Sequence, residues 1–209
     1  MIGLFDSGLG GLSILAAVRE LLPSADLTYV GDQEHAPIGD RPADEVRQFS
    51  GNITDFLISK GASLVTVACH TASAAALRHL REIRPNTQFV GLEPAVKPAA
   101  AVSKTGTIAV LGITATIDGP LLDDVIHRYA DDTNVISIAL PGLADLVEAG
   151  LADSPQVDAM LAREVGPALK AGADALVLGC THYNFVASAV ARLAGPNVRI
   201  VDPAAAVAR

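Results

Sequence analysis

Two nine-residue segments of the chain match each other without a gap. GASLVTVAC occupies residues 61–69, and GADALVLGC occupies residues 172–180. Each opens with glycine and alanine, continues through an apolar run and ends in a cysteine at the same offset. The chain has only two cysteines, so the repeat accounts for both. Such a repeat predicts two similar structural units, each with one cysteine at an equivalent place.

Short apolar runs alternate with helical patterns over most of the chain. We expect eight strands, at residues 2–5, 27–30, 64–68, 88–91, 108–111, 135–140, 175–178 and 198–201. Apolar residues at spacings of three and four predict helices over 46–57 and 157–169, the second with Ser154 as its N-cap. Gly61 and Gly172 fall where a helix ends in a left-handed residue. Strands that are apolar on both faces and alternate with helices predict parallel sheets covered by helices.

The predicted fold class is therefore α/β, with two pseudo-symmetric lobes, each a mostly parallel sheet flanked by helices. IGLFDSG at 2–8 and IAVLGIT at 108–114 lie upstream of the two cysteines as matching first strands. We expect the first lobe over 1–92 and the second over 93–200. Ligands of parallel sheets bind beyond the carboxyl ends of the strands. Both cysteines follow such ends, which predicts an active site in the cleft between the lobes.

Composition excludes several classes of protein. The chain has 209 residues, half of them hydrophobic, which is enough for one large domain or two small ones. Its formal net charge is −8 and it has no cluster of Lys and Arg, so we expect no nucleic-acid partner. The apolar runs are interrupted by Gly, Pro and charge, and the N-terminus lacks the order of a signal peptide. We expect a cytoplasmic protein with no membrane partner.

The paired cysteines suit a reaction that moves a proton on and off one carbon atom. A thiolate is the base and a thiol the acid, so Cys69 and Cys180 together can work in both directions. A helix N-terminus lowers the pKa of a thiol, and each cysteine precedes a predicted helix. Thr71 and Thr181, with the first helix amides, are candidates to bind a carboxylate. The alternative interpretation is that both thiols are buried hydrophobes.

A metal site is a third interpretation of the same residues. Cys69, His70, Cys180 and His182 are ligand types that zinc accepts. Their C-H and C-x-H spacings differ from the C-x-x-C spacing of most zinc sites. We therefore expect no metal.

Two carboxylates also follow predicted strands. Asp6 and Ser7 open the stretch DSGLGG, whose glycines allow a tight turn before a helix. This stretch fits neither the dinucleotide-binding fingerprint nor the P-loop. Asp32 follows the second strand at the same edge of the sheet. The alternatives are that Asp6 or Ser7 only caps the turn and that Asp32 only forms a turn with Gly31.

The motifs together resemble those of the cofactor-independent glutamate racemases, within the aspartate/glutamate racemase superfamily. They occur in the family's order and approximate spacing: FDSGLGG at 5–11, YVGD at 29–32, PIGDR at 37–41, VACHTAS at 67–73, EPAVKPA at 93–99, LVE at 146–148 and LGCTHY at 178–183. The resemblance implies an amino-acid substrate held between two lobes, with no pyridoxal phosphate and no other cofactor. Pyridoxal enzymes need a Schiff-base lysine, and we place none of the four lysines at a strand end.

The resemblance also implies roles for individual residues. Cys69 and Cys180 are the two bases, one on each face of the α-carbon, with Asp6 and His182 as their assistants. The remaining implied site residues contact the substrate or lie near it: Ser7, Asp32, Ile38, Gly39, His70, Thr71, Glu148 and Thr181. The resemblance also implies a homodimer and a role in making D-glutamate for cell-wall peptidoglycan. It implies as well that residues 201–209 return to the first lobe.

Three residues depart from the family's pattern. His70 stands where an asparagine follows the first cysteine, Ile38 replaces a tyrosine, and Asn184 replaces a proline. A cationic His70 beside Cys69 would lower the pKa of that thiol. These departures leave open a different substrate, such as aspartate or a hydantoin, and a relative that binds a ligand without catalysis.

Overall fold

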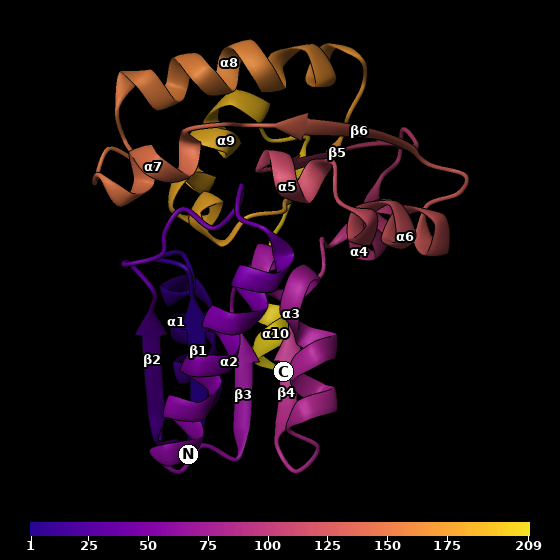
Figure 1. Cartoon of the computed structure of the whole chain (residues 1–209). Coiled ribbons are helices and arrows are strands. Elements are labelled where there is room, and N and C mark those ends of the chain that lie inside the picture. The colour runs from indigo at the N-terminus through magenta and orange to yellow at the C-terminus, as the bar shows by residue number, and fades with distance from the viewer. The chain divides into compact units, whose positions relative to one another are not determined.

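The computed structural model describes all 209 residues and divides into two compact units (Figure 1). The first unit comprises Met1–Leu92 together with Ala204–Arg209, and the second comprises Glu93–Pro203. The sequence predicted a return to the first lobe from residue 201. Residues Arg199–Val201 form the strand that was predicted at 198–201 and belong to the second unit, so the return begins at Ala204.

The first unit is a four-stranded parallel sheet with helices on both faces. Its elements are β1 (Ile2–Asp6), α1 (Leu12–Leu21), β2 (Leu27–Gly31), α2 (Ala43–Ser59), β3 (Leu64–Val67), α3 (His70–Ile83), β4 (Gln88–Gly91) and α10 (Ala204–Ala208). The strand order is β2-β1-β3-β4, and every pair is parallel. Helices α1 and α10 cover one face of this sheet, and α2 and α3 cover the other (Figure 1).

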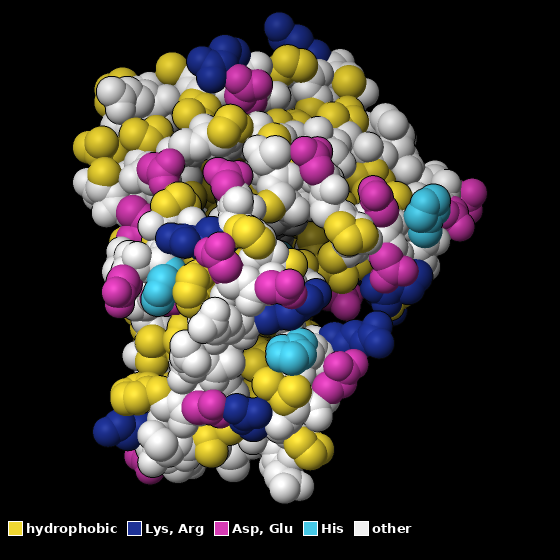
Figure 2. All heavy atoms as spheres, viewed as in Figure 1, with side chains coloured by type: hydrophobic (Ala, Val, Ile, Leu, Met, Phe, Trp, Pro, Cys, Tyr) yellow, Lys and Arg dark blue, Asp and Glu magenta, His cyan; other side chains and the backbone are white.

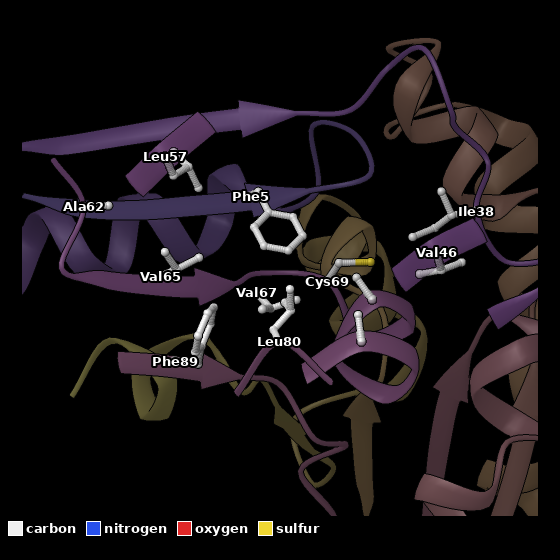
Figure 3. Close-up of a cluster of buried hydrophobic side chains, with 12 residues drawn as sticks. Phe5, Ile38, Val46, Leu57, Ala62, Val65, Val67, Cys69, Leu80 and Phe89 are labelled. Carbon is white, nitrogen blue, oxygen red and sulfur yellow. The ribbon is translucent and has the colours of Figure 1, made fainter. Parts of the chain in front are cut away.

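The alternation of side chains along β1 explains why both faces are covered. Phe5 points into the cluster formed with α2 and α3, where it meets Val67 and Leu80 (Figure 3). Its neighbour Leu4 points into the opposite cluster, with Ile14 of α1. Successive residues of a strand face opposite sides, so a strand that is apolar throughout requires helices on both.

The second unit repeats this design. Its elements are α4 (Val96–Val102), β5 (Thr107–Gly112), α5 (Thr114–Ile117), α6 (Pro120–Tyr129), β6 (Asn134–Ala139), α7 (Leu143–Glu148), α8 (Pro155–Lys170), β7 (Ala175–Leu178), the 3-10 helix η1 (Thr181–Val186), α9 (Ala187–Ala194) and β8 (Arg199–Val201). The strand order is β6-β5-β7-β8, again all parallel. Strand for strand, β1 to β4 therefore correspond to β5 to β8.

The predicted strands and the two predicted helices are confirmed, with boundaries that differ by one or a few residues. Ser154 caps α8 by accepting a hydrogen bond from the N–H of Val157 at 3.4 Å. Gly61 and Gly172 both have positive φ, at 97° and 96°. They follow α2 and α8, so the two halves of the repeat turn from helix to strand in the same way. None of the helices combines the length and the apolar character needed to cross a membrane.

Candidate active site

In the first unit, β1 ends in Asp6, whose buried carboxylate anchors the turn into α1. Oδ1 accepts a hydrogen bond from the backbone N–H of Ser7 at 2.7 Å, and Oδ2 accepts one from the N–H of Gly11 at 2.5 Å. Residue 11 has to be glycine, because a Cβ there would lie 2.8 Å from the Cβ of Asp6. Asp6 thus caps the turn, which was one of the two interpretations of this residue. The same contacts hold Ser7 beyond the strand ends.

Cys69 lies beyond the neighbouring strand, β3, as the N-cap residue of α3. Its thiol is buried, and Sγ lies 3.8 Å from the Oγ of Ser7. In Figure 3 the sulfur points toward the side on which Ile38 and Val46 lie. Thr71 follows in the first turn of α3 and is half-buried. The structure therefore joins Asp6, Ser7 and Cys69 through the serine hydroxyl.

A small cavity of about 10 Å³ opens beside these residues. Asp6, Ser7, Asp32 and Ile38 contribute to its lining, and its volume suits about one water molecule. Ile38 is buried in the same apolar cluster as Cys69, so its side of the cavity is a hydrocarbon wall. Gly39 follows, half-buried. A larger groove of about 420 Å³ lies elsewhere on this unit, along α2 and α3, but none of the predicted site residues lines it.

Asp32 is more than a turn residue. Its backbone N–H donates to the carbonyl oxygen of Asp6 at 2.9 Å, which ties the end of β2 to the end of β1. Its Oδ1 lies 2.7 Å from the Nδ1 of His35. Sequence reasoning missed His35, although its position three residues after Asp32 allows such a side-chain pair in a tight turn.

The environment of His70 corrects the expectation of a cationic neighbour for Cys69. The side chain is 4% exposed, and neither ring nitrogen has a hydrogen-bond partner. Burial lowers the pKa of His70 to about 4, so the imidazole is neutral near pH 7. The lowered pKa of His70 therefore disfavours a thiolate–imidazolium pair with Cys69.

In the second unit, Cys180 lies beyond β7, the strand that corresponds to β3. Its backbone angles, φ −142° and ψ 135°, nearly equal those of Cys69, φ −140° and ψ 128°. Both thiols are buried and neither forms a disulfide. The helices that follow differ, because Ser73 N–H reaches back to the carbonyl of Cys69 in an α-helix while Tyr183 N–H reaches back to that of Cys180 in a 3-10 helix.

The thiol of Cys180 contacts an imidazole, and that imidazole contacts a carboxylate. The Nδ1 of His182 lies 3.7 Å from the thiol, and its Nε2 lies 2.5 Å from Oε1 of Glu148, at the end of α7. An ionised carboxylate only accepts hydrogen bonds, so Nε2 carries the proton and Nδ1 is left as the acceptor for the thiol. The arrangement is suited to a thiol that gives its proton to a neighbouring base, with a third group that orients the base.

Two neighbours complete this site. Thr181 is buried at the start of η1, one residue from the thiol. Tyr183 is fully buried and donates its hydroxyl to the carbonyl of Leu140 at 3.2 Å. Burial, with the charges of Cys180 and Asp145, raises the pKa of Tyr183, which keeps the hydroxyl protonated. Tyr183 thus anchors the turn that carries His182, a role that only the motif LGCTHY could have suggested.

The predicted residues fall into two groups, one at the strand ends of each unit. Asp6, Ser7, Asp32, Ile38 and Cys69 adjoin one another in the first, and Glu148, Cys180 and His182 do so in the second. No three His, Cys, Asp or Glu side chains are grouped so that they could hold a metal ion.

The sequence profile of the Asp/Glu/Hydantoin racemase family matches residues 12–209. The glutamate racemase of Roseiflexus sp. (strain RS-1) is 49% identical over 208 residues, which are 100% of this chain and 76% of the relative. That of Herpetosiphon aurantiacus is 48% identical and is covered to 82%. The crystal structure of Escherichia coli glutamate racemase with L-glutamate and the activator UDP-MurNAc-Ala superposes with a TM-score of 0.90 at 29% identity, covering 99% of this chain and 79% of that one.

Two parallel-sheet units, each with a buried thiol at the equivalent strand end and a polar side chain in contact with it, together with these relatives identify an isomerase of the racemase class. The chain belongs to the Asp/Glu/Hydantoin racemase family.

Proposed function

We propose that the protein is a glutamate racemase that interconverts L-glutamate and D-glutamate by moving the α-proton between Cys69 and Cys180, with no metal and no other cofactor. The observation that carries this proposal is the equivalence of the two thiols. Each follows the same strand of the same topology, in the same backbone conformation, with a polar assistant in contact. The proposal further requires the two units to present their thiols to opposite faces of one α-carbon.

In the direction that starts at the second unit, Nδ1 of His182 accepts the proton of the Cys180 thiol. Glu148 stabilises the imidazolium that results. The thiolate then takes the α-proton, and the electron pair of the broken C–H bond delocalises into the α-carboxylate. The thiol of Cys69 delivers a proton to the opposite face. One C–H bond is broken and one is formed, so the configuration inverts with no net change in composition.

In the reverse direction, Cys69 is the base and its surroundings take the place of the imidazole. Ser7 contacts the sulfur, and its hydroxyl lies 3.4 Å from Oδ1 of Asp6. The first backbone N–H groups of α3 have no partner within the helix and carry its positive dipole end. They stabilise the charge that develops on the substrate carboxylate as the α-proton leaves.

Glutamate is the proposed substrate because the relatives that match the full chain at 48–49% identity are named glutamate racemases. His70 supports an amino-acid ligand at the first unit. A buried imidazole with two unpaired nitrogens is unfavourable unless a ligand or water completes it. It offers one donor and one acceptor, as the family's asparagine does.

The wider biological setting belongs to the same proposal. We place the enzyme in the cytoplasm as a homodimer that supplies D-glutamate for peptidoglycan, with no nucleic-acid or membrane partner. In support, the net charge is −8, and basic side chains are interspersed with acidic ones on the face shown in Figure 2.

The direct test is to incubate the protein with single enantiomers of glutamate, aspartate and a hydantoin in deuterated water. We expect deuterium at the α-carbon and loss of optical rotation with both enantiomers of glutamate. Exchange with another substrate alone would reassign the specificity. Tight binding of glutamate with no exchange at all would identify a ligand-binding relative and refute the proposal.

A further inference from the structure

The segment that follows β2 carries Ile38 to the small cavity, and His35 in the same segment contacts two residues of the cavity wall. The imidazole Nδ1 lies 2.7 Å from Oδ1 of Asp32. The ring also stacks on Phe49 of α2, with ring centroids 3.8 Å apart and an interplanar angle of 20°. Phe49 and Asp32 both line the cavity. His35 therefore bridges a carboxylate and an aromatic ring of the same wall.

Arg41 secures the other end of this segment. Its Nε donates to the carbonyl oxygen of His35 at 2.8 Å, and its guanidinium lies 5.4 Å from the centroid of the Phe49 ring. It also pairs with Glu45 of α2 at 3.2 Å. Arg41 thus holds the backbone of His35, while the imidazole contacts Asp32 and Phe49.

The hydrogen bond has only one direction. An ionised carboxylate has no proton to give, so Nδ1 of His35 donates and Asp32 accepts. This bond engages Oδ1 and turns the carboxylate about its Cβ–Cγ bond into one orientation. The side chain of Asp32 is 13% exposed, so it is nearly withdrawn from water beside Asp6 and Ser7. Oδ2 is left for a cationic group such as the ammonium of an amino acid.

We propose that His35 is a positioning residue for the racemase: it orients the Asp32 carboxylate toward the substrate ammonium. The proposal rests on the proposed function, because it needs an amino acid beside Asp6 and Ser7. His35 acts through Asp32 and does not touch the reacting atoms.

Two substitutions separate the hydrogen bond from the stacking. His35→Phe keeps an aromatic ring for Phe49 and removes the donor. His35→Asn keeps an N–H near the position of Nδ1 and removes the ring. The control is His127→Phe, since the side chain of His127 is 82% exposed on α6 of the other unit. Asp32→Asn and the double variant His35→Phe/Asp32→Asn complete a double-mutant cycle.

We expect His35→Phe to raise KM for glutamate about tenfold, the size of effect for a hydrogen bond to a charged group, with a smaller change in kcat. His35→Asn should recover most of that loss, and the double variant should be no worse than Asp32→Asn alone. An unchanged KM for His35→Phe, or losses that simply add in the double variant, would overturn the proposal.

The histidine resonances keep this test separate from the test of activity. In nitrogen-15 spectra of the free protein, the Nδ1 signal of His35 should be that of a protonated nitrogen and should shift in Asp32→Asn. If the wild type racemises nothing, the proposed function fails, while a shifted signal would still support the His35–Asp32 pair. A signal indifferent to Asp32→Asn would overturn the pair itself.

Discussion

The two units hold their cysteines in the same backbone conformation but surround them with different chemistry. The imidazole of His182 lies next to the Cys180 thiol and contacts the Glu148 carboxylate. The hydroxyl of Ser7 lies next to the Cys69 thiol and contacts the Asp6 carboxylate. The topology β2-β1-β3-β4 is repeated as β6-β5-β7-β8, so the difference lies in side chains and not in the fold.

The carboxylates also differ in what else they do. Asp6 is fully buried and accepts two backbone N–H groups of the turn it anchors. The Glu148 side chain is 25% exposed at the end of α7, where it contacts the imidazole of His182. Asp6 therefore stabilises the turn in addition to its proposed catalytic role, whereas Glu148 contacts the imidazole that is proposed to act with Cys180. The repeated scaffold thus carries the same thiol beside two different polar groups, a hydroxyl in the first unit and an imidazole in the second.

The largest expected effect tests the equivalence of the two thiols. Cys69→Ser and Cys180→Ser should each lower the racemisation rate on the order of 10⁴-fold, the scale seen when an essential nucleophile or base is removed. A serine hydroxyl neither ionises nor delivers protons as a thiol does near neutral pH. Polarimetry with each enantiomer measures the rates, and circular dichroism checks the fold. Racemisation within tenfold of wild type in either variant would break the two-base mechanism.

The second prediction tests the imidazole relay of the second unit. Glu148→Gln should lower kcat/KM on the order of 10²-fold, the usual contribution of positioned acid–base catalysis. The loss must be equal in both directions, because the two enantiomers have the same free energy. Folding stability should change by less than about 1 kcal/mol, since the carboxylate is partly exposed.

The matched variant in the first unit is Asp6→Asn. It should also lower kcat/KM, but here we expect a loss of about 1–3 kcal/mol in the free energy of unfolding. An amide presents one oxygen and an NH₂ group to two backbone N–H groups that need acceptors. Urea unfolding of the two variants side by side gives the comparison. A greater loss of stability in Glu148→Gln than in Asp6→Asn would contradict the division of roles.

The third prediction concerns the residues that follow the cysteines, His70 in the first unit and Thr181 in the second. Burial lowers the pKa of His70 from 6.5 to about 4 in the folded protein. Below pH 6.5 the unfolded chain therefore binds a proton that the folded chain does not, so stability falls as pH falls and levels off near pH 4. The loss attributable to His70 should reach about 3 kcal/mol over this window.

The variant His70→Asn removes this titration and keeps a polar side chain. Its stability should fall less steeply than that of the wild type between pH 6.5 and 4, as measured by urea unfolding at several pH values. The matched control is the same substitution at a histidine whose side chain is 82% exposed, His127→Asn. Parallel curves for wild type and His70→Asn would mean that His70 is accessible to protons in the folded protein.

Sequence patterns were sufficient for the architecture because each strand is apolar on both faces and each half carries the same motif. The nine-residue match placed Cys69 and Cys180 at equivalent strand ends, and the turn signals placed Gly61 and Gly172 at the helix ends. These features depend on neighbours in the chain. The contacts beyond them depend on tertiary structure, and the sequence could not supply those.

His70 shows why local chemistry was insufficient. A histidine next to a cysteine suggests a charged pair, yet burial of the His70 side chain lowers its pKa and favours the neutral imidazole. The His182–Glu148 bond joins residues 34 apart in the chain, and the stacking of His35 on Phe49 brings together the loop after β2 and helix α2. Neither contact leaves a periodic signal in the sequence. The return at Ala204 differed from the predicted 201 because Arg199–Val201 pairs with β7.

The smallest expected effect tests whether equivalent positions of the repeat contribute equally to the free energy of unfolding. Gly61 and Gly172 have φ of 97° and 96°, and a Cβ at either would meet nothing within 4 Å. Gly61→Ala and Gly172→Ala therefore differ from wild type only in backbone strain and should each lower the free energy of unfolding by about 1 kcal/mol. Because the two positions lie in different units, the double variant should lose the sum. Urea unfolding measures all three. If Gly61→Ala and Gly172→Ala lost different amounts of unfolding free energy, the two turns would differ in energy despite their similar geometry.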